Sequence, residues 1–171
     1  TAGTLVLATD AAVTITDIPT IFQLNAIAVQ STGVVTATLA ADSLANLADL
    51  TTAGTDAITI TVNDADAAEL TAANLSTLGG KTSGTVTVIN AVAITGNHDQ
   101  LTAALITSGT KVEVSDATVT INDADATAIT ASELSAIGGA TNGTVTVTNA
   151  IAITGTTAEM IAALVTAGTK V

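Results

Sequence analysis

Pairs of threonines separated by one residue recur along the chain and form its most regular polar pattern. Hydroxyl groups displayed in such an array could order water at a surface or pack against a neighbouring array. Threonine is also the polar residue that β-strands accept best, so the pattern is equally typical of a plain solvated strand face. The pattern comprises Thr14 and Thr16, Thr36 and Thr38, Thr59 and Thr61, Thr85 and Thr87, Thr118 and Thr120, and Thr144 and Thr146.

Two pairs of aspartates have the spacing of a cation site: Asp64 with Asp66, and Asp123 with Asp125. Residues i and i+2 of an extended chain lie on the same face, so each pair could present two carboxylates to a hard cation. Calcium takes about six to eight oxygen ligands, and the following repeat unit offers Ala91 and Ala93 instead. The pairs therefore predict either a weak calcium site of the extracellular kind or a polar turn on a solvated edge.

Catalytic chemistry has little support in the sequence. His98 is the only histidine, and the chain contains no cysteine. A nucleophile with its base, or a histidine metal site, needs partners that this sequence lacks. We expect His98 to be a solvated residue in the first turn of a helix, and we expect the protein not to be an enzyme.

The threonines fall in segments with the alternation of β-strands. In Thr59–Val62, Thr85–Val88 and Thr144–Val147 every second residue is Val or Ile. This period is typical of a half-buried strand, so we expect Val and Ile to point inward and Thr to point outward. Asparagines then turn the chain, and a second short apolar segment follows, as in residues 91–94 and 150–153.

A short helix is predicted after the strands of each unit. Four segments have a capping residue followed three residues later by Gln or Glu, the capping-box pattern: Thr20 with Gln23, Asn97 with Gln100, Thr130 with Glu133, and Thr156 with Glu159. Thr71 with Asn74 is a weaker version, and Asp42 is expected to cap without a reciprocal partner. Glycines follow the helices, and we expect a left-handed backbone there, at Gly33, Gly54, Gly84, Gly109, Gly143 and Gly168.

The chain also repeats itself. Residues 63–112 align without gaps on residues 122–171, with 31 identities in 50 positions, and the N-terminal residues match residues from 107 onward. We interpret residues 1–171 as a single repeat array, with double repeats near 1–51, 52–106 and 107–165 and with residues 166–171 beginning the next. Each double repeat splits into two units, which gives six units beginning near residues 4, 34, 57, 85, 112 and 144.

A unit of this size cannot bury both its strand and its helix alone, so copies must stack on one another. The predicted fold is an α/β solenoid of about six stacked coils, each with a parallel β-strand, a short second strand and a short helix. In such a stack the threonine pairs would form two ranks, with about 4.7–4.9 Å between coils. This array resembles the ice-binding faces of antifreeze β-solenoids.

Charge and hydropathy exclude other classes of function. The chain has 15 acidic and 3 basic residues and a net charge of −12, so it repels nucleic acid. The mean hydropathy is +0.63, but no uninterrupted apolar stretch reaches about 18 residues, so we expect no membrane insertion. No charged segment followed by an apolar run is visible at the N-terminus, so no signal peptide is predicted.

Three segments carry a resemblance to a known group of proteins: Ser31–Thr38, Thr130–Gly139 and Asn149–Gly155. They resemble the Ala/Thr-rich tandem repeats of giant secreted or cell-surface proteins of marine cyanobacteria and related bacteria. The resemblance implies an extracellular structural or adhesive protein, secreted by a type I system. Such proteins often carry Gly-Gly-x-Gly-x-Asp calcium repeats, but Gly79-Gly80-Lys81 and Gly138-Gly139-Ala140 lack that continuation.

These features predict a non-enzymatic, extracellular structural module that acts as a spacer, a coat, or a segment of a self-assembling fibre or surface layer. We expect its partners to be copies of itself or flanking repeats, added end to end through open strand edges. No firm cofactor is predicted. One alternative is an ice-binding or adhesive solenoid that uses the threonine ranks, and another is a calcium-dependent adhesin segment that uses the aspartate pairs.

Overall fold

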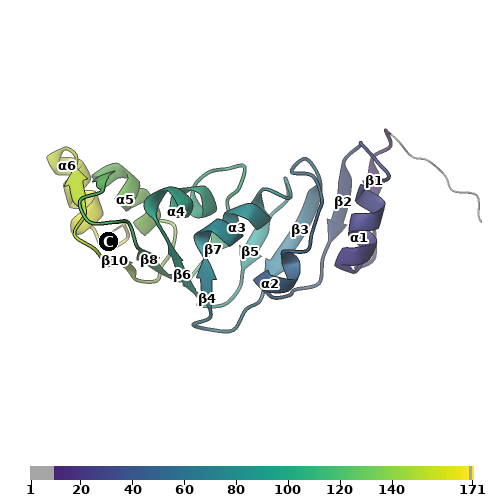
Figure 1. The fold of residues 1–171 in the computed structure, drawn as a ribbon, viewed down its shortest axis with the longest axis horizontal. Helices are drawn as coiled ribbons and strands as arrows, with labels where there is room; N and C mark the ends of the chain where they lie inside the picture. Colours follow the sequence, from purple (N-terminus) through teal and green to yellow (C-terminus); the bar gives the residue numbers. More distant parts are fainter. Residues whose placement is uncertain (1–9, 170) are drawn as a thin grey trace, which may run out of the picture.

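The computed structural model describes residues 10–169 and residue 171. Within this range the chain is a mixed α/β protein with parallel sheets and six helices. The molecule is elongated, and its first and last elements lie at opposite ends (Figure 1). The predicted start of the first unit, near residue 4, lies outside the described residues.

Six helices of at most eight residues alternate with the strands along the chain. They are α1 (Ile21–Ala28), α2 (Leu44–Leu47), α3 (Ala72–Gly79), α4 (His98–Leu105), α5 (Ala131–Gly138) and α6 (Thr157–Leu164). In the described part of the chain, no helix has the length and apolar character needed to cross a lipid bilayer. We number as units 1 to 6 the segments that end with these helices.

Eleven strands are described, and every pair between them is parallel. The first sheet has the order β1-β2-β3-β5-β7, the second β10-β8-β6-β4 and the third β11-β9. The bounds are β1 (Val13–Thr14), β2 (Val35–Thr38), β3 (Ala57–Val62), β4 (Glu69–Thr71), β5 (Val86–Val88), β6 (Ala93–Gly96), β7 (Glu113–Val114), β8 (Thr118–Ile121), β9 (Ala128–Thr130), β10 (Val145–Val147) and β11 (Ala152–Thr154).

The number of strands differs between units. Among the described residues, units 3, 4 and 6 have the two strands that the sequence predicts, whereas units 1 and 2 have one each and unit 5 has three. The expectation of a second strand in every unit is therefore wrong for units 1 and 2, and unit 5 has one strand more than expected. In unit 1 only four residues separate Ile15 from Thr20, the residue that caps α1, which leaves no room for a second strand.

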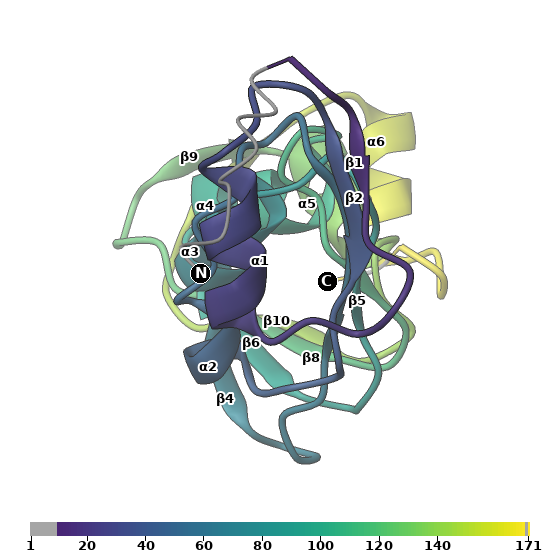
Figure 2. The ribbon, with the colours of Figure 1, turned by 90° about the vertical axis from the view of Figure 1, so that its right-hand side faces the viewer.

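The third strand of unit 5 changes how the repeats connect. Strand β8 is the repeat equivalent of β3, yet β8 pairs with β6 in the second sheet, while the inserted strand β7 continues the first sheet. We call this change the sheet shift. In the end-on view, α6 accordingly lies on the side that β1 and β2 occupy at the other end of the molecule (Figure 2).

The core contains Leu, Ile, Val and Ala side chains from both strands and helices. Ile58, Ile60 and Val62 of β3 are fully buried, with the intervening threonines facing outward as alternation predicts. Helices α2 to α5 bury an apolar stripe, as Leu75 and Leu78 do in α3, whereas α1 buries only Leu24 and α6 only Ala163. Side chains of this size fill the interior without aromatic groups.

All four predicted capping boxes are present, at the starts of α1, α4, α5 and α6. In α5, the Thr130 N–H donates to Glu133 Oε2 at 2.9 Å, and the Glu133 N–H donates to Thr130 Oγ1 at 3.2 Å. Hydrogen bonds from the Thr130 hydroxyl and amide hold the pKa of Glu133 below its ordinary value. Helix α2 differs from the prediction, because Ser43 rather than Asp42 is its cap.

Glycines are needed for close approach rather than for a left-handed backbone. No described glycine has a positive φ, so the expectation of left-handed glycines is wrong. A Cβ at Gly84 would instead overlap the backbone of Ile58 in the preceding unit. The described non-glycine residues with positive φ are Ala67 at 60° and Ala126 at 61°, at equivalent positions of the repeat.

Candidate functional site

None of the twelve patterned threonines is buried, but they do not form two continuous ranks. In the first sheet Thr38, not Thr36, aligns with Thr59, so the register moves by two residues between β2 and β3. The sheet shift then separates Thr87, which pairs with Glu113, from the threonines of β8. The two-rank expectation is therefore wrong.

One four-residue rank of threonines exists in the second sheet, formed by Thr71, Thr95, Thr120 and Thr146. The first two of these residues lie outside the predicted Thr-x-Thr pattern. Their position in the second short strand of units 3 and 4 was the available signal. The neighbouring rank of this sheet contains Glu69, Ala93 and Thr118, so the surface lacks the doubled rank of an ice-binding lattice.

The aspartate pairs join neighbouring units. Asp64 Oδ2 accepts a hydrogen bond from the Leu44 N–H of unit 2 at 2.7 Å. Asp66 Oδ1 accepts from the Ala91 N–H of unit 4 at 3.1 Å. The two carboxylates of one pair therefore bind in opposite directions along the chain, rather than converging on one cation.

The second pair repeats this arrangement. Asp123 Oδ2 accepts from the His98 N–H of unit 4 at 2.7 Å, and Asp125 Oδ1 accepts from the Ala150 N–H of unit 6 at 3.0 Å. We call Asp64, Asp66, Asp123 and Asp125 the staple aspartates. Asp123 is only 6% exposed, so the interpretation of these pairs as a solvated edge is wrong for it. In the described range, no group of three or more acidic or histidine side chains is arranged to hold a metal ion.

The left-handed alanines belong to the same contact. The Ala67 N–H donates to the Ala91 carbonyl at 2.8 Å, while the Ala91 N–H donates to Asp66. One peptide segment of the next unit is thus held at both its donor and its acceptor. Ala126 makes the equivalent bond to Ala150 at 2.8 Å. A left-handed alanine costs of the order of 1 kcal/mol, which these bonds offset.

His98 is part of the contact between units 4 and 5. Its side chain is 16% exposed, and its Nδ1 lies 2.7 Å from Asp123 Oδ1, so the expectation of a solvated histidine is wrong. Burial lowers the pKa of His98, but the hydrogen bond to Asp123 and the charge of Asp123 raise it. The nearby charges of Asp99 and Glu133 add to this, and the net pKa lies above the ordinary value of 6.5.

Replacing His98 by threonine, the residue at the equivalent position 157, is expected to destabilise the fold more at acidic than at alkaline pH. Because the folded-state pKa is raised, the stabilisation by protonated His98 is complete below the unfolded-state pKa and is lost as the pH rises through the folded-state value. We expect a loss of about 1 kcal/mol at pH 6 and a smaller loss at pH 8.5, measured by urea unfolding. A difference that grows with pH would contradict this assignment.

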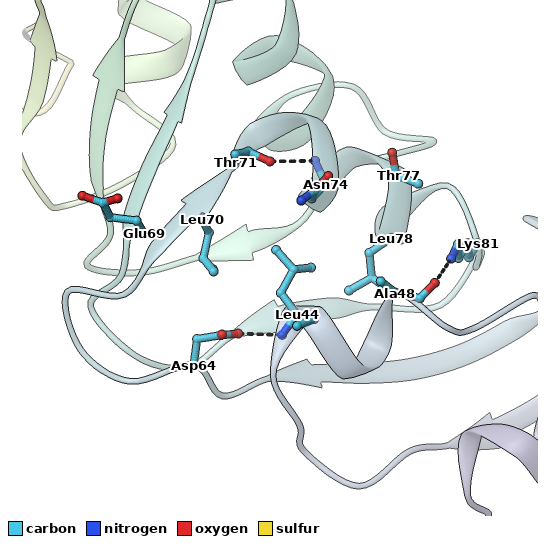
Figure 3. A pocket seen from close by; sticks show the side chains of 11 residues that line it. Leu44, Ala48, Asp64, Glu69, Leu70, Thr71, Asn74, Thr77, Leu78 and Lys81 are labelled. Atoms are coloured by element: carbon cyan, nitrogen blue, oxygen red, sulfur yellow. Dashed lines mark hydrogen bonds between the residues drawn. The ribbon is translucent and has the colours of Figure 1, made fainter.

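A groove lies between α2 and α3, with Leu44, Leu70 and Leu78 among the residues that line it (Figure 3). Helix α2 beside it has four residues, and α3 has eight. Lys81 Nζ donates to the Ala48 carbonyl at 2.6 Å across it, and Asp64 is bound to Leu44. Asp64 and Lys81 thus bind across this groove, whereas Thr71 and Thr77 bond within α3, to the Asn74 N–H and the Ala73 carbonyl.

Comparison of the chain with protein-family models, with curated proteins and with solved structures finds no match. The chemistry of the contacts between units is uniform, because the staple aspartates, their alanine partners and His98 all bind the adjacent unit.

Proposed function

We propose that the chain is an α/β solenoid with a structural function, a rod-like spacer segment of an extracellular or cell-surface assembly. The observation that carries this proposal is the recurrence of the staple contacts at equivalent positions of successive repeats. Asn90 Nδ2 and Asn149 Nδ2 extend the recurrence, since they donate to the Asp64 and Asp123 carbonyls, both at 2.6 Å. Polar groups used in this way stabilise a stack of units, and few polar groups are then left for catalysis.

The surface charge is consistent with a spacer. A net charge of −12 makes parallel copies repel each other along their sides at low salt. An extracellular location is part of the proposal and is supported by the resemblance of the three segments given above. Ice binding has less support because the threonine ranks are interrupted, and calcium-dependent adhesion has less because the staple aspartates diverge.

A duplicated repeat tests the structural proposal. We expect insertion of a second copy of residues 63–121 after residue 121 to lengthen the molecule by about 10–20 Å, between the strand and helix spacings for two added units. The thermal midpoint should rise, because two more interfaces between neighbouring units are added. Small-angle X-ray scattering and calorimetry measure these changes.

A shuffled version of the same 59-residue insert is the control, and it should lower the midpoint without adding an ordered increment of length. An insert of native sequence that leaves the maximum dimension unchanged would contradict a rod built from stacked coils.

A further inference from the structure

Strand β4 lies at an edge of the second sheet, although other units flank it on both sides in the chain. It pairs with β6 of unit 4, and no strand among the described residues pairs with its other edge. The Ala93 N–H donates to the Ala68 carbonyl at 2.8 Å, so the backbone groups of Ala68 and Leu70 face β6. The N–H groups of Glu69 and Thr71 and the Glu69 carbonyl therefore face the other edge, which we call the open edge of β4.

Unit 2 leaves this edge open because its chain stays beside the first sheet. Only the four residues 39–42 separate β2 from the residue that caps α2. The Leu39 N–H donates to the Thr59 carbonyl and the Asp42 N–H to the Thr61 carbonyl, both at 3.1 Å, so this segment follows β3. Unit 2 therefore supplies no second strand to pair with β4.

The groove between α2 and α3 borders the open edge, since Glu69 and Leu70 are among the residues that line it. Its volume is about 340 Å³, within the range of about 300–1,000 Å³ that is usual for ligand sites. Leu70 and the two other leucines of the groove provide an apolar surface. Asp64 and Glu69 lie at one end of the groove and Lys81 at the other, so a positively charged group of a ligand belongs at the first of these ends (Figure 3).

We infer that the open edge of β4 binds an extended peptide segment of a partner protein, which adds to the second sheet as a parallel strand. The peptide residue opposite Leu70 donates its N–H to the Glu69 carbonyl and accepts a hydrogen bond from the Thr71 N–H. Its side chain lies on the same face as Leu70, so it must be apolar to fit the groove. This docking involves units 2 and 3 alone, and it adds a binding role to the spacer function proposed above.

The second strands of the chain itself indicate the sequence that fits. Strands β6, β9 and β11 all begin with Ala-Ile-Thr, and Ile94 of β6 lies opposite Leu70 on the paired edge of β4. A segment on the open edge has the same alternation, but its residue opposite Glu69 should be Lys or Arg, because opposite charges on adjacent strands attract. The net charge of −12 favours a basic partner in the same way.

A synthetic peptide with blocked ends and the sequence Lys-Val-Lys-Ile-Thr-Gly tests the inference. It copies residues 91–96 with both alanines replaced by lysine. Fluorescence anisotropy of the labelled peptide with the whole chain measures binding, and amide hydrogen exchange at Glu69 and Thr71 should slow when it binds. The same peptide methylated at the isoleucine nitrogen should bind at least about tenfold more weakly, because it cannot donate to the Glu69 carbonyl.

Two variants of the protein test the charge and the groove. Glu69→Lys should weaken binding about fivefold or more, and a peptide with Glu in place of its second lysine should then bind better than the original. Asp49→Lys is the matched control, since Asp49 is exposed, does not line the groove and undergoes the same change of charge. Ala45→Trp should abolish binding, because Ala45 is an exposed residue of α2 at the groove and the larger side chain fills it.

Four results would overturn the inference. They are a peptide that does not bind at about 1 mM, binding that N-methylation leaves unchanged, equal weakening by Glu69→Lys and Asp49→Lys, and exchange that slows elsewhere but not at Glu69 and Thr71. Self-association of the wild type that Ala45→Trp abolishes would identify a second copy as the occupant and would overturn the assignment of a separate partner.

Discussion

Replacing Gly79 by alanine is expected to lower the free energy of unfolding by about 3 kcal/mol or more. Gly79 is the last residue of α3, and the chain entering unit 5 passes directly over it. A Cβ there would overlap the carbonyl oxygen, carbonyl carbon and Cα of Thr110. All three are backbone atoms, so no side-chain rotation relieves the overlap, and units 3 and 5 must move apart.

Gly80 provides a matched control one residue away. It has a φ of −69°, and the nearest atom to an added Cβ is the Ser76 carbonyl oxygen at 3.5 Å. Gly80→Ala should therefore be neutral or stabilise by up to about 1 kcal/mol, through the lower entropy of the unfolded chain. Urea unfolding of the two variants measures the contrast, and equal losses would show that backbone approach at Gly79 is not the cause.

Replacing Asp123 by alanine is the second change expected to have a large effect, a loss of about 2–4 kcal/mol. The substitution leaves the His98 N–H and the His98 ring, both in the contact between units 4 and 5, without their acceptor. Helices α4 and α5 pack less extensively than α3 with α4, so this carboxylate contributes a large share of the contact.

Asp125→Ala is the control for Asp123→Ala. Asp125 is exposed and accepts one bond, from the Ala150 N–H, so its loss should cost about 1 kcal/mol or less. Thermal unfolding with calcium and with a chelator distinguishes stapling from cation binding. Equal and calcium-dependent losses for the two variants would indicate a shared ion and contradict the staple assignment.

The capping boxes and the inward-facing strand residues were predictable, because both depend on neighbours within a few residues. Thr130 and Glu133 can form a capping box in any helix that starts at this point. Ile60 and Thr59 face opposite sides of any half-buried strand. The sequence also predicts the division into units, since the repeat is visible without a structure. What these features share is that their partners are near in the chain.

The contacts of the staple aspartates and the register of the sheets could not be predicted, because their partners lie in other units. The sequence shows that Asp64 and Asp66 are two residues apart, but the left-handed turn at Ala67 decides which unit each carboxylate meets. The glycine requirement at Gly79 likewise arises from a segment thirty-one positions later, at Thr110. The recurrence of both features at Gly138 and Asp123 was the available signal.

In the proposed solenoid, the sheet shift would give the stack of units a screw sense. After β7 is inserted, β8, the repeat equivalent of β3, lies in the second sheet beside β6. The position of equivalent strands therefore rotates about the long axis. Each further junction of this kind would rotate the following units about the long axis in the same direction. One side of a long array would then face an adjacent array only once in each turn. Parallel arrays would touch at evenly spaced points, and such contacts produce an open mesh rather than a closed sheet.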